Sequence, residues 1–281
     1  MRFAHHARSR AAVLLVFVGG CAQKADLAAA SFVDGLRLIG VQAEPPEAAP
    51  GDAIMLTAWV VDTLGRSVDV TWSACTLPSN GTANAGCTDG SGNGLVGLGS
   101  GLVLGAVVPT VDAATLGPPD ATLGVYLPIV VHARAGDDAL DAVYRLRVRV
   151  ASLLPIGCTV GPPYGPHCEP NRNPTIDRID PLGPESDPQS ATIDSSWALQ
   201  LHYSDDSSEE YGNPAPVFER LTTQWFATGG SFPDAPIGGT GVQKLVLDRA
   251  LPPSGGTIDL WAVGHDERGG TTLTHRTFVM Q

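Results

Sequence analysis

Positive charge is scarce in this sequence. Lysine and arginine together number 17 against 29 aspartates and glutamates, so the formal net charge is −12. Lys24 and Lys244 are the only lysines, and arginine supplies the remaining positive charge. An acidic surface repels phosphate groups, so we expect neither nucleic acid nor anionic membrane headgroups as partners.

Recognisable catalytic motifs are also absent from the sequence. Gly97–Gly101 is rich in glycine, but no helical pattern follows it and no Lys-Ser or Lys-Thr pair ends it, as a phosphate-binding loop would require. We therefore assign it to a long flexible loop from Pro78 to Gly101. No serine stands in a Gly-x-Ser-x-Gly context, which argues against a nucleophile elbow. We predict that the chain is not an enzyme.

Charged residues make up only 16% of the chain, whereas 33 glycines and 23 prolines supply many turn formers. Many short strands and loops suit this composition better than long helices do. The sequence therefore predicts an all-β fold. Alternating or β-branched segments predict strands at 36–41, 54–61, 67–73, 102–108, 126–135, 143–150, 176–181, 196–203, 221–230, 243–247, 257–263 and 271–279.

The N-terminus has the pattern of an export signal. Three arginines precede the apolar run Ala11–Val18, which is far too short to span a bilayer. Val18-Gly-Gly-Cys21 resembles a bacterial lipobox, in which the signal is cut before the cysteine and the cysteine is acylated. This resemblance implies a signal peptide at 1–20, a lipid anchor at Cys21 and a tether to residue 35.

The same resemblance implies a location. Ala22 follows the cysteine at the position where aspartate signals retention in the inner membrane of many Gram-negative bacteria. An exported, lipid-anchored protein of the outer membrane, facing the periplasm or the cell surface, is the expected result. Its membrane contact would be made through the N-terminal lipid.

Four cysteines remain once Cys21 is assigned to the lipid, and each pair nearest in sequence brackets a loop rich in turn formers. An exported chain meets an oxidising compartment, which favours disulfides. Short loops favour Cys75 with Cys87 and Cys158 with Cys168, although four cysteines allow three pairings. Zinc is the weaker alternative, because no Cys-x-x-Cys spacing occurs.

The order of predicted elements repeats in two halves. Each half has an entry strand, a proline-rich break, an apolar strand, an acidic turn, a strand with a tryptophan (Trp72 or Trp225) and a terminal hairpin. At these strands and at the hairpin Asp266–Gly270, the chain resembles bacterial immunoglobulin-like and PKD-like modules. The resemblance implies two tandem Ig-like antiparallel β-sandwiches, at 36–152 and 175–281, joined by a Pro/Gly/Cys-rich connector at 153–174.

The predicted strand at 143–150 alternates between two residue types. Tyr144, Leu146, Val148 and Val150 hold one face, and three arginines occupy the other. Alternation of this kind predicts a half-buried strand with its polar face in solvent. We therefore expect the side chains of Arg145, Arg147 and Arg149 to point outward.

Two acidic clusters offer candidate metal ligands. Asp205, Asp206, Glu209 and Glu210 lie within six residues and could supply oxygens to calcium. The order lacks the EF-hand alternation and its glycine, so a solvated loop at a strand end is the favoured interpretation. A second cluster lies at a predicted hairpin tip, at Asp137, Asp138 and Asp141, and has the same two interpretations.

Five tryptophans complete the candidates. Trp72, Trp197 and Trp225 lie on apolar strand faces and are expected in the core. Trp59 and Trp261 fall partly opposite their apolar neighbours, which marks them for inspection as sugar-stacking positions.

The sequence thus favours a non-catalytic binding, scaffolding or adhesion module, without cofactor, whose ligand is a protein or polysaccharide. The alternative is an exported carbohydrate-active enzyme or sugar-binding accessory protein with a site between the two sandwiches. A calcium-stiffened adhesin is a third class.

Overall fold

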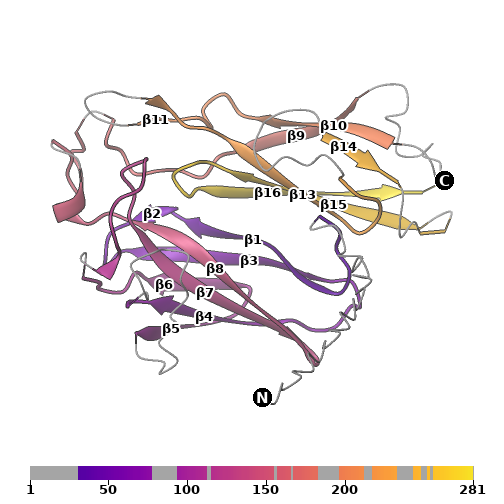
Figure 1. The fold of residues 1–281 in the computed structure, drawn as a ribbon, viewed down its shortest axis with the longest axis horizontal. Helices are drawn as coiled ribbons and strands as arrows, with labels where there is room; N and C mark the ends of the chain where they lie inside the picture. The colour runs from indigo at the N-terminus through magenta and orange to yellow at the C-terminus, as the bar shows by residue number, and fades with distance from the viewer. Residues whose placement is uncertain are drawn as a thin grey trace, which may run out of the picture.

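The computed structural model describes residues 31–77, 94–112, 115–154, 157–165, 167–182, 196–211, 217–232, 243–247, 252–253 and 256–280. Its regular structure is almost entirely β-strand, with one short 3₁₀ turn at Ala151–Leu153 (η3) (Figure 1). Among these residues, no helix has the length and hydropathy needed to cross a membrane. The predicted signal peptide, Cys21 and Cys87 lie outside the described residues.

The first sandwich packs two sheets around one apolar core. The core is formed by alternate residues of facing strands, as in β3, where Ile54, Leu56 and Ala58 are buried and their neighbours are not. The smaller sheet has the order β1 (Leu36–Glu44), β3 (Ala53–Asp62), β6 (Val103–Val107). The larger sheet has the order β2 (Glu47–Ala48), β8 (Asp138–Val148), β7 (Tyr126–Ala135), β4 (Asp69–Cys75), β5 (Leu95–Ser100).

The second sandwich has a separate core that includes Trp197, Trp225 and Phe278. Trp197 meets Phe278 edge to face, with ring centroids 5.1 Å apart. One sheet has the order β14 (Gln243–Val246), β10 (Ser196–Tyr203), β9 (Ile176–Leu182), and the other β13 (Thr222–Ala227), β15 (Thr257–His265), β16 (Thr271–Val279). A short ribbon is formed by β11 (Glu210–Tyr211) and β12 (Val217–Phe218).

The prediction of an all-β chain built from antiparallel sandwiches is confirmed; β2 with β8 is the one parallel pair among the described strands. The assignment of Gly97–Gly101 to a flexible loop is wrong, because β5 runs through Ser100 and pairs with β4. Glycine lowers strand propensity, but at this edge the ladder with β4 supplies the order. Gly99, at a φ of 146°, lies where β4 and β5 shift register.

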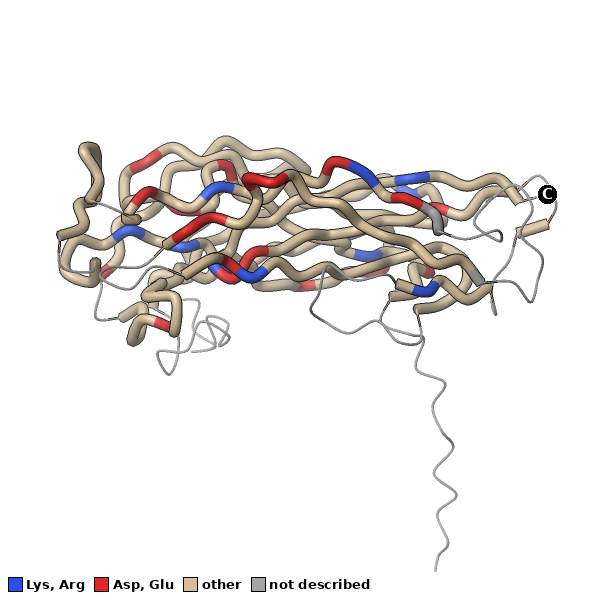
Figure 2. Tube along the Cα trace, turned by 90° about the horizontal axis from the view of Figure 1, so that it is seen from above, with Lys and Arg blue, Asp and Glu red and all other residues tan. Residues whose placement is uncertain are grey.

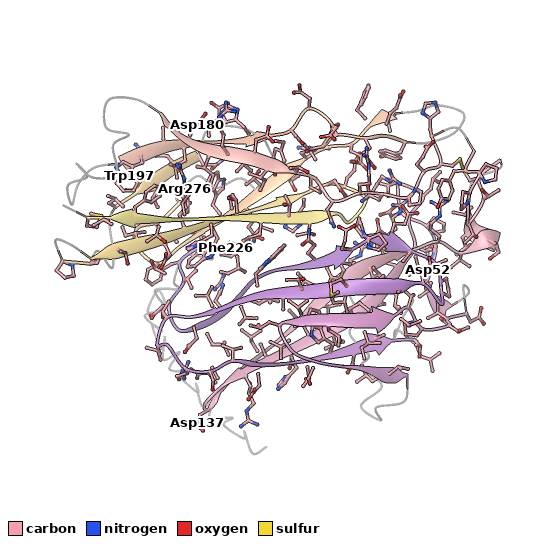
Figure 3. All side chains as sticks on the ribbon, turned by 180° about the vertical axis from the view of Figure 1, so that it is seen from behind. Asp52, Asp137, Asp180, Trp197, Phe226 and Arg276 are labelled. Atoms are coloured by element: carbon pink, nitrogen blue, oxygen red, sulfur yellow. A yellow bond between two sulfur atoms is a disulfide. The ribbon has the colours of Figure 1, made fainter. Side chains whose placement is uncertain are left out.

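The two sandwiches lie side by side, with β1 of the first against β15 and β16 of the second (Figure 1). A third apolar cluster fills this contact: Val33, Ile39, Phe226, Trp261 and Val263 are buried in it. Figure 3 shows Phe226 at the boundary between the two sandwiches. We call this cluster the apolar junction.

Candidate functional site

Beyond one end of the apolar junction lies a cluster of buried charges, centred on Glu47. The side chain of Glu47 is only 4% exposed, and three guanidinium groups surround it. Arg149 Nη1 lies 3.0 Å from Glu47 Oε1, while Arg147 Nε and Arg268 Nη2 lie 3.3 and 3.0 Å from Oε2. Arg268 belongs to the second sandwich, so one carboxylate binds both sandwiches. We call this the ionic junction.

Strand pairing brings Glu47 to its arginines. The two-residue strand β2 runs parallel to the end of β8, with Glu47 beside Arg147 and Ala48 beside Val148. Arg149 N donates to Ala48 O at 2.9 Å, which extends this contact by one residue. β2 therefore places an acidic side chain over the polar face of β8.

The expected outward orientation is wrong for two of the three arginines. Arg147 and Arg149 are buried, because β2 and the connector cover the end of β8. Arg147 donates from Nη1 and Nη2 to the hydroxyl and carbonyl oxygens of Thr122. Arg145 stacks on the ring of Tyr126, with its Cζ 4.1 Å from the ring centroid.

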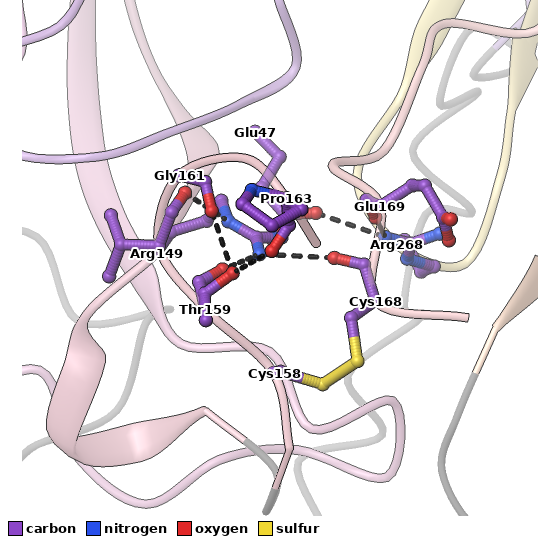
Figure 4. Close-up of a disulfide and its surroundings, with 10 residues drawn as sticks. Glu47, Arg149, Cys158, Thr159, Gly161, Pro163, Cys168, Glu169 and Arg268 are labelled. Atoms are coloured by element: carbon purple, nitrogen blue, oxygen red, sulfur yellow. Dashed lines mark hydrogen bonds and ion pairs between the residues drawn. A yellow bond between two sulfur atoms is a disulfide. The ribbon is translucent and has the colours of Figure 1, made fainter. Parts of the chain in front are cut away.

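The disulfide Cys158–Cys168 closes a loop that also binds Arg149 (Figure 4). Arg149 Nη2 donates to the carbonyl oxygens of Thr159 and Cys168, the latter at 3.0 Å. This pairing is the one predicted from loop length. The disulfide holds backbone carbonyls where they accept hydrogen bonds from those N–H groups of Arg149 that do not contact Glu47.

The turn between β15 and β16 presents Arg268 to the ionic junction. Asp266 Oδ1 accepts from the backbone N–H groups of Arg268 and Gly270, both at 2.8 Å, which fixes the turn. Asn171 of the connector donates from Nδ2 to Asp266, and from its backbone N to Glu47 Oε2 at 2.8 Å. Asn171 thus links the two sandwiches a second time.

Two carboxylates that contact Arg268, those of Glu47 and Glu219, have opposite pKa shifts. Burial by itself raises the pKa of Glu47, but Arg147, Arg268, the Asn171 N–H and Arg149 outweigh it and hold the pKa below its usual value. Burial and the nearby charge of Asp266 raise the pKa of Glu219 to about 8, although Arg268 Nη1 lies 3.2 Å away. Glu47 is therefore ionised at neutral pH, whereas Glu219 keeps its proton to a higher pH than an exposed glutamate does.

The protonated state of Glu219 makes stability depend on pH. Between its usual pKa of 4.5 and its folded pKa of about 8, the folded chain keeps a proton that the unfolded chain has lost. This group therefore lowers the free energy of unfolding as pH rises through that range, by up to about 1.4 kcal/mol per pH unit. We expect Glu219→Gln to remove this slope, measured by urea unfolding at a series of pH values.

The matched control is Glu210→Gln, at a carboxylate on β11 with a side chain 42% exposed. It is expected to keep the wild-type dependence on pH. A Glu219→Gln profile parallel to that of the wild type between about pH 5 and 8 would contradict the raised pKa.

A small pocket, with a cavity volume of about 40 Å³, opens beside the ionic junction, between the end of β8 and the disulfide loop. Its walls include Arg147, Arg149, His167, Tyr211 and Arg268. The three guanidinium groups already bind Glu47, and they also donate to backbone carbonyls or to the hydroxyl of Thr122. The arrangement is suited to holding segments together.

The acidic turn does not converge on one point. Glu209 pairs with Arg172 and lies 3.5 Å from Arg268, whereas Glu210 Oε2 lies 3.8 Å from His167. Asp206 accepts from the hydroxyl of Ser204, and Asp205 is exposed. Across the described part of the chain, no group of three or more His, Cys, Asp or Glu side chains is placed to hold a metal ion.

In the second acidic cluster, two carboxylates contact basic side chains and one is exposed. Asp138 lies 2.7 Å from Arg66, and Asp141 lies 2.6 Å from His132 Nδ1. Asp137 is exposed at the hairpin tip (Figure 3). The structure thus separates these three carboxylates as well.

The remaining predicted positions fall in the cores or beyond the described residues. Trp72, Trp197 and Trp225 are buried, as expected. Trp261 is also buried, with its ring stacked on His275, and the half-buried Trp59 packs on the apolar junction, so neither offers an open platform for a sugar ring. Cys75 is buried and disulfide-bonded, while its predicted partner Cys87 lies outside the described residues.

The ionic junction itself was missed by reasoning from sequence. Its members come from distant parts of the chain, and Arg268 is separated from Glu47 by 221 positions. One signal was present. The predicted strand at 143–150 carries three of the 17 basic residues of the chain, and so many arginines close together indicate acidic partners.

No protein-family model matches this chain, and none of the curated proteins matches it. Among solved structures, it is similar to three N-terminal domains of the bacteriophage RB49 Hoc protein, at 12% identity and a TM-score of 0.24, over 88% of this chain and 59% of that one. It is similar to cadherin domains 3–6 of protocadherin gamma B2, at 11% identity and a TM-score of 0.22, over 90% of this chain and 46% of that one. The chain spans less than two thirds of either.

The fold and the site together define an all-β protein in which antiparallel sheets form two apolar cores. Between the cores lie the apolar junction and the ionic junction.

Proposed function

We propose that this chain is a cell-envelope lipoprotein that works as a non-catalytic binding or scaffolding module, with two Ig-like sandwiches beyond a short lipid-anchored tether. The observation that carries the proposal is the use of the buried charges. Glu47 joins Arg147 and Arg149 of its own sandwich to Arg268 of the other. Buried charged groups that fix the orientation of one sandwich against the other are better suited to a rigid support for surface loops than to catalysis.

The surface charge is consistent with this role. Acidic residues are spread along the length of the molecule (Figure 2), and the formal net charge is −12. Such a surface opposes contact with phosphate-rich partners and favours a protein or polysaccharide as the ligand.

The anchor rests on the sequence of residues 1–23, and above all on Cys21. Its test is the intact mass and the membrane fractionation of the chain expressed in a bacterium that processes lipoproteins. We expect the wild type to be cut before Cys21, to carry acyl chains and to be recovered with membranes. Cys21→Ser should lose the acyl mass, stay unprocessed and leave the membrane fraction.

The matched control is Ala22→Ser, which alters the neighbouring position and keeps the cysteine. It should remain acylated. A wild type that is soluble, or that is cut at another position, would overturn the lipoprotein proposal.

A further inference from the structure

The outer edge of β6 has unusual properties for an edge strand. β6 pairs with β3 on one side, and no strand of the described residues pairs with its other side. Val108 N donates to Asp52 O, and Ala58 N donates to Leu102 O, so even-numbered residues form the ladder with β3. Successive residues of a strand point their backbone N–H and C=O groups to opposite edges. The N–H and C=O groups of Val103, Gly105 and Val107 therefore point to the open edge.

Four other edges of the two sandwiches are covered, interrupted or charged. Phe32 bridges to β13 and Ser231 bridges to β14. β5 is interrupted by a register shift near Gly99, and β9 carries Arg178 and Asp180. Bulges, charges and covering segments are the usual protection of sheet edges against further pairing. Within the described part of the chain, β6 has none of these along Val103–Val107.

The segment around β6 is also apolar and uncharged. No charged residue occurs from Gly94 to Val111 in a chain with 46 charged residues among 281. Met55, Val103 and Val107 are exposed by 45, 59 and 58%, on the face of the sheet beside this edge. An extended backbone with free hydrogen-bonding groups fits another extended strand, and its apolar flanks fit an apolar partner.

We propose that β6 is a dimerisation edge, which pairs antiparallel with β6 of a second copy of this chain around Gly105. A two-fold axis at Gly105 places Val103 of one copy opposite Val107 of the other, so the same residues serve both sides. The outward N–H and C=O groups of Val103, Gly105 and Val107 then lie opposite the outward C=O and N–H groups of the same residues in the second copy. The smaller sheets of the two copies become one continuous sheet.

Charge favours a second copy as the occupant. Two chains with a net charge of −12 repel each other over most of their surface. The stretch from Gly94 to Val111 has no charged residue, so its own side chains add no repulsion at the contact. The face of the sheet is open at Gly105, because a Cβ built on it meets nothing within 4 Å. The inference is independent of the lipid anchor.

The first test removes one outward N–H. The full chain carrying Cys21→Ser, so that no lipid or detergent adds mass, is compared with the same chain carrying Gly105→Pro by sedimentation velocity over a range of concentrations. We expect a dimer for the former. Proline lacks the N–H that would bond the second copy but leaves the ladder with β3 intact, so association should weaken on the order of tenfold or more.

Gly105→Ala is the matched control, because it adds a side chain and keeps the N–H; it should still dimerise. A second pair of variants tests the register without proline. Val103→Glu with Val107→Glu, and Val103→Lys with Val107→Lys, should each be monomeric alone and form a mixed dimer when combined, since Val103 faces Val107 across the two-fold axis. A parent chain that stays monomeric, or a dimer unaffected by Gly105→Pro and by both charged variants, would overturn the proposal.

Discussion

Replacing Glu47 by glutamine is expected to lower the free energy of unfolding by about 3 to 5 kcal/mol. Glutamine keeps the size of the side chain but removes the charge that Arg147, Arg149 and Arg268 share. Three guanidinium groups, each at most 8% exposed, would then lie in the interior without their common carboxylate. Buried charge left unpaired is among the costliest results of a single substitution. Urea unfolding at neutral pH measures the change.

Glu44→Gln is the matched control for this prediction. Glu44 is an exposed carboxylate at the end of β1 that accepts from Asn173 Nδ2 at 2.7 Å. Its replacement should lower the free energy of unfolding by no more than about 1 kcal/mol, as is usual for surface pairs. A loss of similar size in the two variants would show that the ionic junction contributes no more than an exposed contact.

Phe226→Ala is expected to destabilise the chain by about 3 to 5 kcal/mol and to uncouple the two sandwiches. Phe226, on β13, is 3% exposed and packs in the apolar junction, where Arg37 lies over its ring at 5.6 Å. The cavity left by the ring would lie between the sandwiches, outside the core of either. We therefore expect calorimetry to resolve two unfolding transitions in the variant and one in the wild type.

Phe218→Ala offers a control with the same chemical change. Phe218, on β12, is 71% exposed, so its loss should alter stability by less than about 0.5 kcal/mol. A single transition in Phe226→Ala, with a loss as small as that of Phe218→Ala, would contradict the coupling role of the apolar junction.

Strands with an alternating or β-branched pattern could be predicted from sequence. The predicted limits of β7, β10 and β16 agree with the observed ones. Their pattern is local, since each strand carries its own buried face. β2, with two residues, carries no such pattern, and β5 was hidden by its glycines. These two strands exist because β8 and β4 supply their hydrogen-bonding partners.

The candidate site was much less predictable. Arg147 and Arg149 were expected in solvent because alternation identifies a polar face without identifying what covers it. Burial of that face depends on β2 and on the turn of Arg268, and contacts at such separations leave no periodic trace in the sequence. The acidic turn shows the same limit, since Glu209 and Glu210 contact different basic side chains.

The sequence alone determined the all-β class and most strand positions, and it favoured the pairing of Cys158 with Cys168, because strand pattern and loop length are local properties. Tertiary structure alone decided that the sandwiches lie side by side, that Glu47 binds arginines of both, and that no described strand pairs with the outer edge of β6. Each of these depends on which surfaces meet. Apolar burial and charge pairing select those contacts among residues that are far apart in the sequence, so no local pattern reveals them.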